Sequence, residues 1–270
     1  MQTIMWVSNK GHSMTSGPEQ STEIKTTDTA FEILEYLVEH EGGRVSEIAE
    51  ECGLANSTVH RHLQTFHDLR YVIQEDQTYH LGLKFLDLGI WVRQRKPEYQ
   101  MIAEKVTEIA EDTEERAQLI VEEHGESVYI YIERGEHAVE FGHSEGMRLP
   151  LHTTAAGKSI MAHLPDEHLE EILERNPLEP ATDSTITSET ELRADLDTIR
   201  ERGYSFNKQE HVSGLRAVGV PVMWPDDTVI GAISVSGPTH RMKEEWFEKE
   251  LPDLLLGIAN ELELNMAYHL

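Results

Sequence analysis

Apolar residues in the first third of the chain recur three and four positions apart, which is the spacing of amphipathic helices. One such run begins after Thr27 or Asp28, either of which is a suitable N-cap, and stops at the glycine pair at 42–43. A second, shorter run follows Ser46, whose hydroxyl is expected to cap it, and Glu47 suits the positive end of its dipole. The pattern predicts two helices joined by a short connection.

The next segment predicts a third helix, with Asn56 or Ser57 as its cap after a glycine turn. Two short alternating runs follow at 71–73 and 78–81 around a polar tip, and this spacing predicts a β-hairpin. Helix, helix, turn, helix and hairpin is the order of a winged helix-turn-helix domain. We place this domain at residues 23–82.

The remaining chain predicts a linker helix at 83–97, ended by Pro97, and a larger domain at 98–270. Its expected elements are a helix near 101–110, strands at 118–121, 127–132 and 138–142, helices at 154–163, 167–174 and 189–202, strands at 204–206, 217–223 and 229–236, and a last helix from about 243. Strands in two groups with helices between them indicate an α+β fold. Residues 1–22 are polar and are expected to form a flexible tail, with Met14 as an alternative start.

One face of the predicted third helix carries side chains suited to touching DNA. Arginine pairs with guanine and glutamine with adenine in the major groove, each contact giving roughly 1–3 kcal/mol of discrimination. A solvated face is the alternative for a lone helix, but the preceding helix and the hairpin favour DNA reading. The central stripe is Ser57, His60, Arg61 and Gln64, and the full candidate set is Asn56, Ser57, Thr58, His60, Arg61, Gln64 and Thr65.

The composition adds an unusual charge. The 270 residues include 50 aspartates and glutamates against 23 lysines and arginines, a formal net charge of −27. Such an excess resembles the hydrated acidic surface of proteins from salt-loving archaea, and an acidic protein of a mesophile is the alternative. Residues 53–97 hold four acidic and six basic residues, whereas residues 98–270 hold 36 acidic and 14 basic ones. We therefore expect the acidic surface mainly outside the DNA reader.

Several other classes find little support in the sequence. No run approaches the ~20 apolar residues of a membrane span, and the N-terminal segment lacks the apolar core of a signal peptide, so a cytoplasmic protein is expected. The only cysteine, Cys52, lies on the apolar side of a predicted helix and is expected in the core. AAGKS lacks the first glycine of a phosphate-binding loop, since His152 stands there. The histidines show no metal-ligand spacing, so no metal site is expected. No cofactor and no catalytic residue are expected either.

Longer motifs resemble the isocitrate-lyase-regulator (IclR) family of transcription factors. The matching runs are VSEIAEECGLANSTVHRHLQTFHDLRYV, YHLGLKFLDLG, LPLHTTAAGKSIMAHLP, IRERGYSFNKQEHVSGLRAVGVPV and GAISVSGPTHRM, in this order, over about residues 25–270. The resemblance implies a winged helix joined to a GAF-like domain that binds a small-molecule effector, commonly an organic acid or a sugar breakdown product. It also implies homodimers or homotetramers on palindromic operator DNA.

The resemblance also implies an effector pocket on one side of the second domain's sheet. It assigns backbone N–H groups to Ala155, Ala156 and Gly157, polar contacts to Asn207, Ser234 and Ser236, and a wall to Leu215 and Ala217. The residues alone leave two alternatives open. Small residues at a helix start suit either anion binding by amides or a tight contact with the sheet, and two serines on one strand face either a pocket or solvent. The family often has an acidic residue where Asn207 stands and a cysteine where Ala217 stands, so the effector's charge and shape stay open.

Three hypotheses of function follow. The leading one is a ligand-responsive DNA-binding regulator of a catabolic pathway, without enzymatic activity. The second is a metabolite-binding protein or enzyme whose winged helix serves only dimerisation, and the third is an interaction module whose acidic domain docks basic partners. Replacing Arg61 and Gln64 by alanine separates them, because only the first hypothesis expects the loss of operator binding.

The acidic wing tip generates a prediction about salt. Glu75 and Asp76 stand where a wing usually touches phosphate, and in molar salt the counterion-release contribution to affinity is nearly spent. We expect operator affinity to rest on base contacts, shape and hydration, and hence to persist in molar KCl. Fluorescence anisotropy titrations of operator DNA at increasing KCl would measure this, and a collapse of affinity would contradict it.

Overall fold

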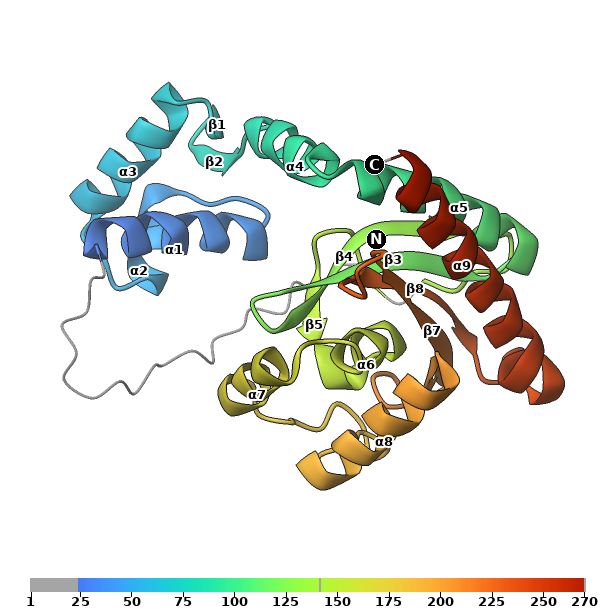
Figure 1. The fold of residues 1–270 in the computed structure, drawn as a ribbon. Helices are drawn as coiled ribbons and strands as arrows, with labels where there is room; N and C mark the ends of the chain where they lie inside the picture. Colours follow the sequence, from blue (N-terminus) through green and yellow to red (C-terminus); the bar gives the residue numbers. More distant parts are fainter. Residues whose placement is uncertain (1–23, 141, 270) are drawn as a thin grey trace. The chain divides into compact units, whose positions relative to one another are not determined.

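The computed structural model describes residues 24–140 and 142–269, and these divide into two compact units on either side of the Arg95–Lys96 bond (Figure 1). The expected tail at 1–22 and the alternative start at Met14 lie outside the described residues. Within the described ranges, no helix combines the length and the apolar character that crossing a bilayer would need.

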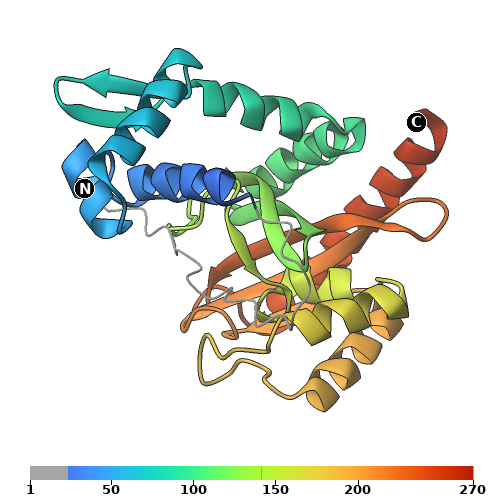
Figure 2. The ribbon, with the colours of Figure 1, turned by 90° about the vertical axis from the view of Figure 1, so that its left-hand side faces the viewer.

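The first unit has the element order expected of a winged helix-turn-helix. Its elements are α1 (Lys25–Glu39), α2 (Val45–Glu51), α3 (Asn56–Asp68), β1 (Val72–Glu75), β2 (Thr78–Leu81) and α4 (Lys84–Gln94). The two strands pair antiparallel as a hairpin, and β1 packs against α3 (Figure 2). Ile33, Ile48 and Leu63 lie fully buried in the core between the helices, and Cys52 packs at its edge as expected. α4, the expected linker helix, buries none of its residues.

The predicted caps of the first two helices are wrong. Thr27, Asp28 and Ser46 all lie inside the helices that they were expected to begin. α1 begins after Ile24, which offers no side-chain cap, and α2 begins after Arg44, whose backbone N–H donates to the Glu47 carboxylate at 2.8 Å. The Glu47 carboxylate thus bonds the N–H of the N-cap residue and lies at the positive end of the helix dipole, and neither interaction needs a hydroxyl cap.

The second unit is an α+β domain built on a six-stranded antiparallel sheet in the order β5-β4-β3-β8-β7-β6. Its elements are α5 (Pro97–Thr113), β3 (Arg116–Glu123), β4 (Glu126–Arg134), β5 (Arg148–Pro150), the 3₁₀ turn η1 (Leu151–Thr153), α6 (Ala155–Met161), α7 (Asp166–Arg175), α8 (Glu189–Arg202), β6 (Ser205–Lys208), β7 (Leu215–Met223), β8 (Val229–Pro238), the π-helical turn η2 (Trp246–Glu250) and α9 (Leu251–His269). This architecture confirms the predicted fold class.

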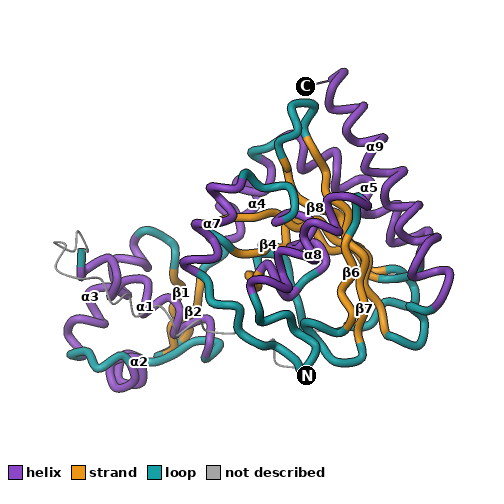
Figure 3. The backbone as a smooth tube through the Cα atoms, turned by 60° about the horizontal axis from the view of Figure 1, so that its bottom comes forward, coloured by secondary structure: helices purple, strands orange, loops and turns teal. Residues whose placement is uncertain are grey.

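Helices cover both faces of this sheet. α5 and α9 pack on one face, whereas α6, α7 and α8 cover the other, and Figure 3 shows β6, β7 and β8 lying between α8 and α9. Alternation along a strand separates the two cores. Ile233 and Val235 of β8 join the core under α5 and α9, and Ala232 joins the core under α6. Ser234 and Ser236 therefore face α6 instead of solvent.

One predicted strand is wrong. The described residues of 138–142 form no strand, and β5 at 148–150 pairs with the edge of β4 instead. The chain makes a turn at Gly135, where Ala138 N–H donates to the Gly135 carbonyl at 3.1 Å. It returns to the sheet at Gly146, whose N–H donates to the Tyr129 carbonyl at 2.7 Å. The turn residues at these glycines outweigh the apolar pattern between them.

The close approach of α6 to β7 generates a prediction about stability. A Cβ atom at Gly219 would lie 2.7 Å from the backbone of Ala155 and Ala156, so Gly219→Ala must displace α6. We expect the free energy of unfolding to fall by roughly 1–3 kcal/mol, as for other overpacked cores. Gly257→Ala is the matched control: space is open there on α9, and alanine should raise stability by roughly 0.5–1 kcal/mol. Urea unfolding followed by circular dichroism would measure both, and equal effects would contradict the close approach.

Candidate functional site

The polar face of α3 is available to solvent, as the sequence predicts. Val59 and Leu63 on its opposite face are fully buried, which fixes the helix by one side only. The exposed candidates are Asn56, Ser57, His60, Arg61, Gln64 and Thr65, and Thr58 is half-buried. The structure therefore places all seven candidate DNA-binding residues at positions that a duplex could reach, with the shorter α2 preceding them.

The start of α3 differs from the prediction in a way that bears on DNA contact. Ala55 occupies the N-cap and gives no side-chain bond, so Asn56 and Ser57 are the first two helical residues instead of caps. Their side chains stay available for phosphate or base edges, beside N–H groups that favour anions. Gln64 donates to Asp68 at 2.9 Å, a bond it must exchange to read a base, and the Thr65 hydroxyl donates to the Arg61 carbonyl at 2.9 Å.

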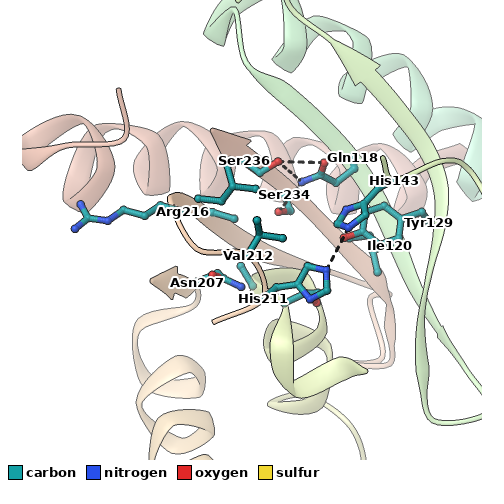
Figure 4. Close-up of a pocket in the computed structure, with 14 residues that line it drawn as sticks. Gln118, Ile120, Tyr129, His143, Asn207, His211, Val212, Arg216, Ser234 and Ser236 are labelled. Carbon is teal, nitrogen blue, oxygen red and sulfur yellow. Dashed lines mark hydrogen bonds between the residues drawn. The ribbon is translucent and has the colours of Figure 1, made fainter. Parts of the chain in front are cut away.

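A cavity of about 50 Å³ lies on the α6 side of the sheet in the second unit (Figure 4). Six of the expected effector residues line it, namely Ala155, Asn207, Leu215, Ala217, Ser234 and Ser236. Eight lining residues were not predicted, namely Gln118, Ile120, Tyr129, His143, Thr154, His211, Val212 and Arg216. A volume of this size exceeds the roughly 10–15 Å³ that one water needs by the same measure, so the cavity suits a small ligand.

Ala155 lines the cavity whereas Ala156 and Gly157 do not, and the assignment of the three amides to a ligand stays a prediction. The N–H of Gly157 donates to the Thr154 hydroxyl at 2.9 Å, so that amide is already bonded. A Cβ atom at Gly157 would lie 2.2 Å from the Leu151 carbonyl oxygen. At Gly157 the missing side chain therefore allows the tight contact between α6 and the preceding turn.

Polar groups on the sheet side of the cavity are tied to one another. The amide nitrogen of Gln118 donates to Ser234 at 3.1 Å and to Ser236 at 3.3 Å (Figure 4). Asn207 holds the backbone, since its amide nitrogen donates to the Thr153 carbonyl at 2.6 Å and its oxygen accepts the N–H of Glu210 at 3.0 Å. Asn207 thus shapes the cavity as well as lining it, whereas the two serine hydroxyls can still reorient towards a ligand.

A pair of histidines faces this wall from two loops. The Nε2 atoms of His143 and His211 lie 3.2 Å apart, and the rings of Tyr129 and His143 are 5.5 Å apart. Burial, reinforced by His211 and Arg116, lowers the pKa of His143 to about 3, and burial also lowers the pKa of His211. Burial raises the pKa of Tyr129 to about 12. Around neutral pH both imidazoles are therefore neutral and the phenol keeps a proton to donate.

The sequence could have identified only some of the eight lining residues that were not predicted. Gln118 is a polar residue inside an otherwise apolar strand, and it is antiparallel partner to Ser234, so facing positions on two strands identify it. His143 and His211 lie in loops 68 residues apart, and no periodicity links them. Among the described residues, no cluster of three or more possible metal ligands occurs.

Family models match both units of the chain. The IclR helix-turn-helix domain matches residues 26–76, and the bacterial transcriptional regulator IclR C-terminal domain matches residues 99–263. The chain belongs to the IclR family. The helix-turn-helix order of the first unit and the sheet domain that holds the cavity agree with this membership. The chain is therefore a DNA-binding regulator of the helix-turn-helix type.

Individual IclR-family relatives cover nearly the whole chain. The probable HTH-type transcriptional regulator ArcR of Halobacterium salinarum is 32% identical over 88% of this chain and 92% of its own length. The crystal structure of Thermotoga maritima IclR is 31% identical, with a TM-score of 0.77 over 91% of this chain and 100% of that one. An IclR homologue from Microbacterium hydrocarbonoxydans, complexed with 4-hydroxybenzoate, shares the fold at 22% identity and a TM-score of 0.75, over 90% and 99% of the two chains.

The lowered pKa of His143 predicts an acid-sensitive contribution to stability. Its folded pKa of about 3 lies below the ordinary 6.5, so the unfolded chain binds the proton first. The contribution of His143 is therefore complete above about pH 6.5 and is lost as the pH falls towards 3. We expect His143→Gln to flatten the fall in unfolding free energy between neutral pH and pH 5, measured by urea unfolding. The same slope in wild type and His143→Gln would contradict this; His168→Gln, outside the cavity on α7, is the control.

Proposed function

We propose that this protein is a ligand-responsive transcription regulator that binds palindromic operator DNA as a homodimer or homotetramer and controls a catabolic pathway. Its effector is a small organic acid or a sugar-derived metabolite that occupies the cavity. The observation that carries the proposal is the exposed polar face of α3, which is held by a buried apolar face and preceded by α2. We propose no catalytic role for the cavity, and we place the protein in the cytoplasm with its DNA.

The DNA-reading part of the proposal rests on α3. Arg61 and Gln64 are one helical turn apart and exposed, so both can reach base edges when the helix lies in a major groove. Ser57, at the start of the helix, then meets the phosphate backbone. Residues 56–65 of α3 include no acidic residue, and Asp68, the first one after them, accepts a hydrogen bond from Gln64 at 2.9 Å.

The effector part rests on the cavity and on one structural relative. The IclR homologue of Microbacterium hydrocarbonoxydans is complexed with 4-hydroxybenzoate, a small hydroxy acid. A ligand changes operator affinity only if it binds one arrangement of the protein more tightly than another. The two loops that carry His143 and His211 border the cavity, so they are the elements that ligand binding would rearrange.

The oligomer part rests on α4. None of its residues is buried, yet it carries a row of large apolar side chains that solvent alone would not favour. Trp91 is 64% exposed and Leu86 is 59% exposed, and Leu88, Ile90 and Val92 are exposed as well, as is Leu83 just before the helix. A second copy of this chain is the partner that a palindromic operator requires, because operator symmetry mirrors protein symmetry. We therefore propose α4 as a self-association surface.

The acidic surface fits a protein that works in concentrated salt. The charge of −27 is largely carried by the second unit, and a relative at 32% identity comes from Halobacterium salinarum. We propose a halophilic host for this regulator. The property is separate from its specificity, because net charge governs hydration and solubility and does not set the fold.

Loss of the Arg61 side chain tests the regulator. We expect Arg61→Ala to weaken operator binding by about tenfold or more, the loss of one bidentate base contact, and to remove discrete palindromic peaks in genome-wide footprinting in the native host. Arg95→Ala, which removes an exposed positive charge at the end of α4, is the matched control and should leave the peaks in place. Wild-type protein without peaks in any growth condition would sink the DNA-binding proposal.

Charges on α4 test the self-association surface. We expect Leu86→Glu combined with Trp91→Glu to shift the protein towards monomers in sedimentation velocity, because two apolar contacts become repulsive across a symmetric interface. Leu264→Glu is the control, since Leu264 is an exposed leucine on α9 in the second unit. If Leu264→Glu dissociates the protein and the α4 variant does not, the surface lies on α9 instead.

A further inference from the structure

The helix α3 carries little permanent positive charge for a helix that meets DNA. Within residues 56–68, Arg61 is the one arginine and there is no lysine. The helix has three histidines instead, namely His60, His62 and His67. Imidazole is the side chain that ordinarily gains or loses its charge between pH 5 and 8. Most of the positive charge that α3 can offer to a duplex therefore depends on pH.

His60 lies in the middle of the exposed polar face of α3 and is free to bond DNA. It shares that face with Ser57, Arg61 and Gln64, and all four side chains are exposed. Within the part of the chain that the structure describes, no protein group forms a hydrogen bond, an ion pair or a ring contact with its imidazole. Both ring nitrogens are therefore available to acceptor atoms of a duplex.

The other described histidines of the first unit already have protein contacts. These are His40 with Glu51 at 3.5 Å, His62 with the Phe66 ring at 6.5 Å, His67 with Asp68 at 3.9 Å and His80 with the Glu41 carbonyl at 2.9 Å. His60 thus differs from its neighbours in having neither a carboxylate nor a carbonyl of the protein to bond. Its gain of charge is left for an external partner.

The charged residues around α3 leave His60 without a neutralising partner. The helix packs against α1, α2 and β1, and no carboxylate on these elements or on α3 lies within 4.0 Å of the His60 nitrogens. The charged groups of the three elements are Lys25, Asp28, Glu32, Glu35 and Glu39 of α1, Glu47, Glu50 and Glu51 of α2, and Glu75 of β1. A proton on His60 would therefore add a second positive charge beside Arg61.

We propose that His60 is a proton-linked DNA contact, so that acidification strengthens operator binding. The inference rests on the proposed function, because it assumes that α3 lies in the major groove of an operator. A neutral imidazole has one N–H to donate, whereas the protonated ring has two. Guanine edges and phosphate oxygens are both acceptors, and a hydrogen bond from a charged donor is the stronger one.

The sign of the effect follows from linkage. A negatively charged duplex favours the protonated ring, so the complex binds more protons than the free protein and affinity rises as the pH falls. Two subunits on a palindrome would take up as many as two protons. The buried His143 acts in the opposite direction, because its contribution to stability is lost on acidification. A rise in affinity therefore cannot come from that group.

Affinity measured at several pH values tests this assignment. Full-length protein is titrated, at fixed KCl, into two fluorescently labelled duplexes, and anisotropy is followed between about pH 8 and about pH 6. One duplex is the palindrome under the strongest footprinting peak, and the other is a mixed-sequence duplex of the same base composition. We expect wild-type affinity for the palindrome to rise about tenfold or more over this range, as uptake of one to two protons would give.

Three variants identify the group that takes up the proton. His60→Gln, which keeps a donor but stays neutral, should remove most of the rise. His60→Lys, with its permanent charge, should bind with little dependence on pH. His67→Gln is the matched control on the same helix, beyond the reading positions and beside Asp68, and should keep the full rise. Circular dichroism at each pH verifies that every variant is folded.

Three outcomes would overturn the proposal. They are equal wild-type affinities at both ends of the pH range, a full rise in His60→Gln, and a wild type that binds neither duplex at any pH. The wild-type comparison needs no variant, so it stands even if a variant fails to fold. A palindrome bound no tighter than the mixed-sequence duplex would refute the sequence-reading regulator alone, since the pH dependence stays readable on the mixed-sequence duplex.

Discussion

The buried ammonium group of Lys158 ties together the part of the molecule that contains the cavity. At 1% exposure this cation must be paired, and it lies 2.8 Å from Asp195 on α8 and 2.6 Å from Glu210 in the loop between β6 and β7. Lys158 thereby joins α6 to α8 and to the β6–β7 loop. Since the same loop continues to His211, the ion pair between α6 and this loop also restrains the position of one half of the histidine pair. Removing Lys158 would leave the buried Glu210 carboxylate without its cation.

The cavity also depends on the sheet, which has one apolar face that packs against helices and one face with polar side chains. On the α5 and α9 side, β3 and β8 contribute buried apolar residues such as Leu119 and Ile233. On the other side the same two strands present Gln118 and Ser234, bonded to each other at 3.1 Å. Because neighbouring residues on a strand face opposite sides, one strand can serve a dry core and a ligand cavity at once. Gly219 completes the arrangement by letting α6 approach β7 closely.

The sequence predicted features that depend on neighbouring residues better than features that depend on residues far apart in the chain. Strict periodicity predicted the hairpin and the strands β7 and β8, and the spacing of Ser234 and Ser236 placed both on one face. Helix caps failed, because backbone N–H groups can be served by several nearby side chains or by water. The strand expected at 138–142 is wrong, because the conformation of so short an apolar run depends on the turns on either side of it. His143 and His211 could not be paired from sequence, since only the folded loops bring them within 3.2 Å.

The charge of the chain raises the question of how so acidic a protein binds anions. Two surfaces give the same answer: residues 56–65 of α3 include no acidic residue, and neither does the cavity lining. At an ionic strength of about 1 M the Debye length is about 3 Å, so repulsion from carboxylates elsewhere is screened before it reaches either surface. For the DNA binding proposed for α3, what remains is the short-range geometry of donors such as Arg61. Specificity of the proposed interface in concentrated salt would then depend on local composition, and net charge would govern hydration.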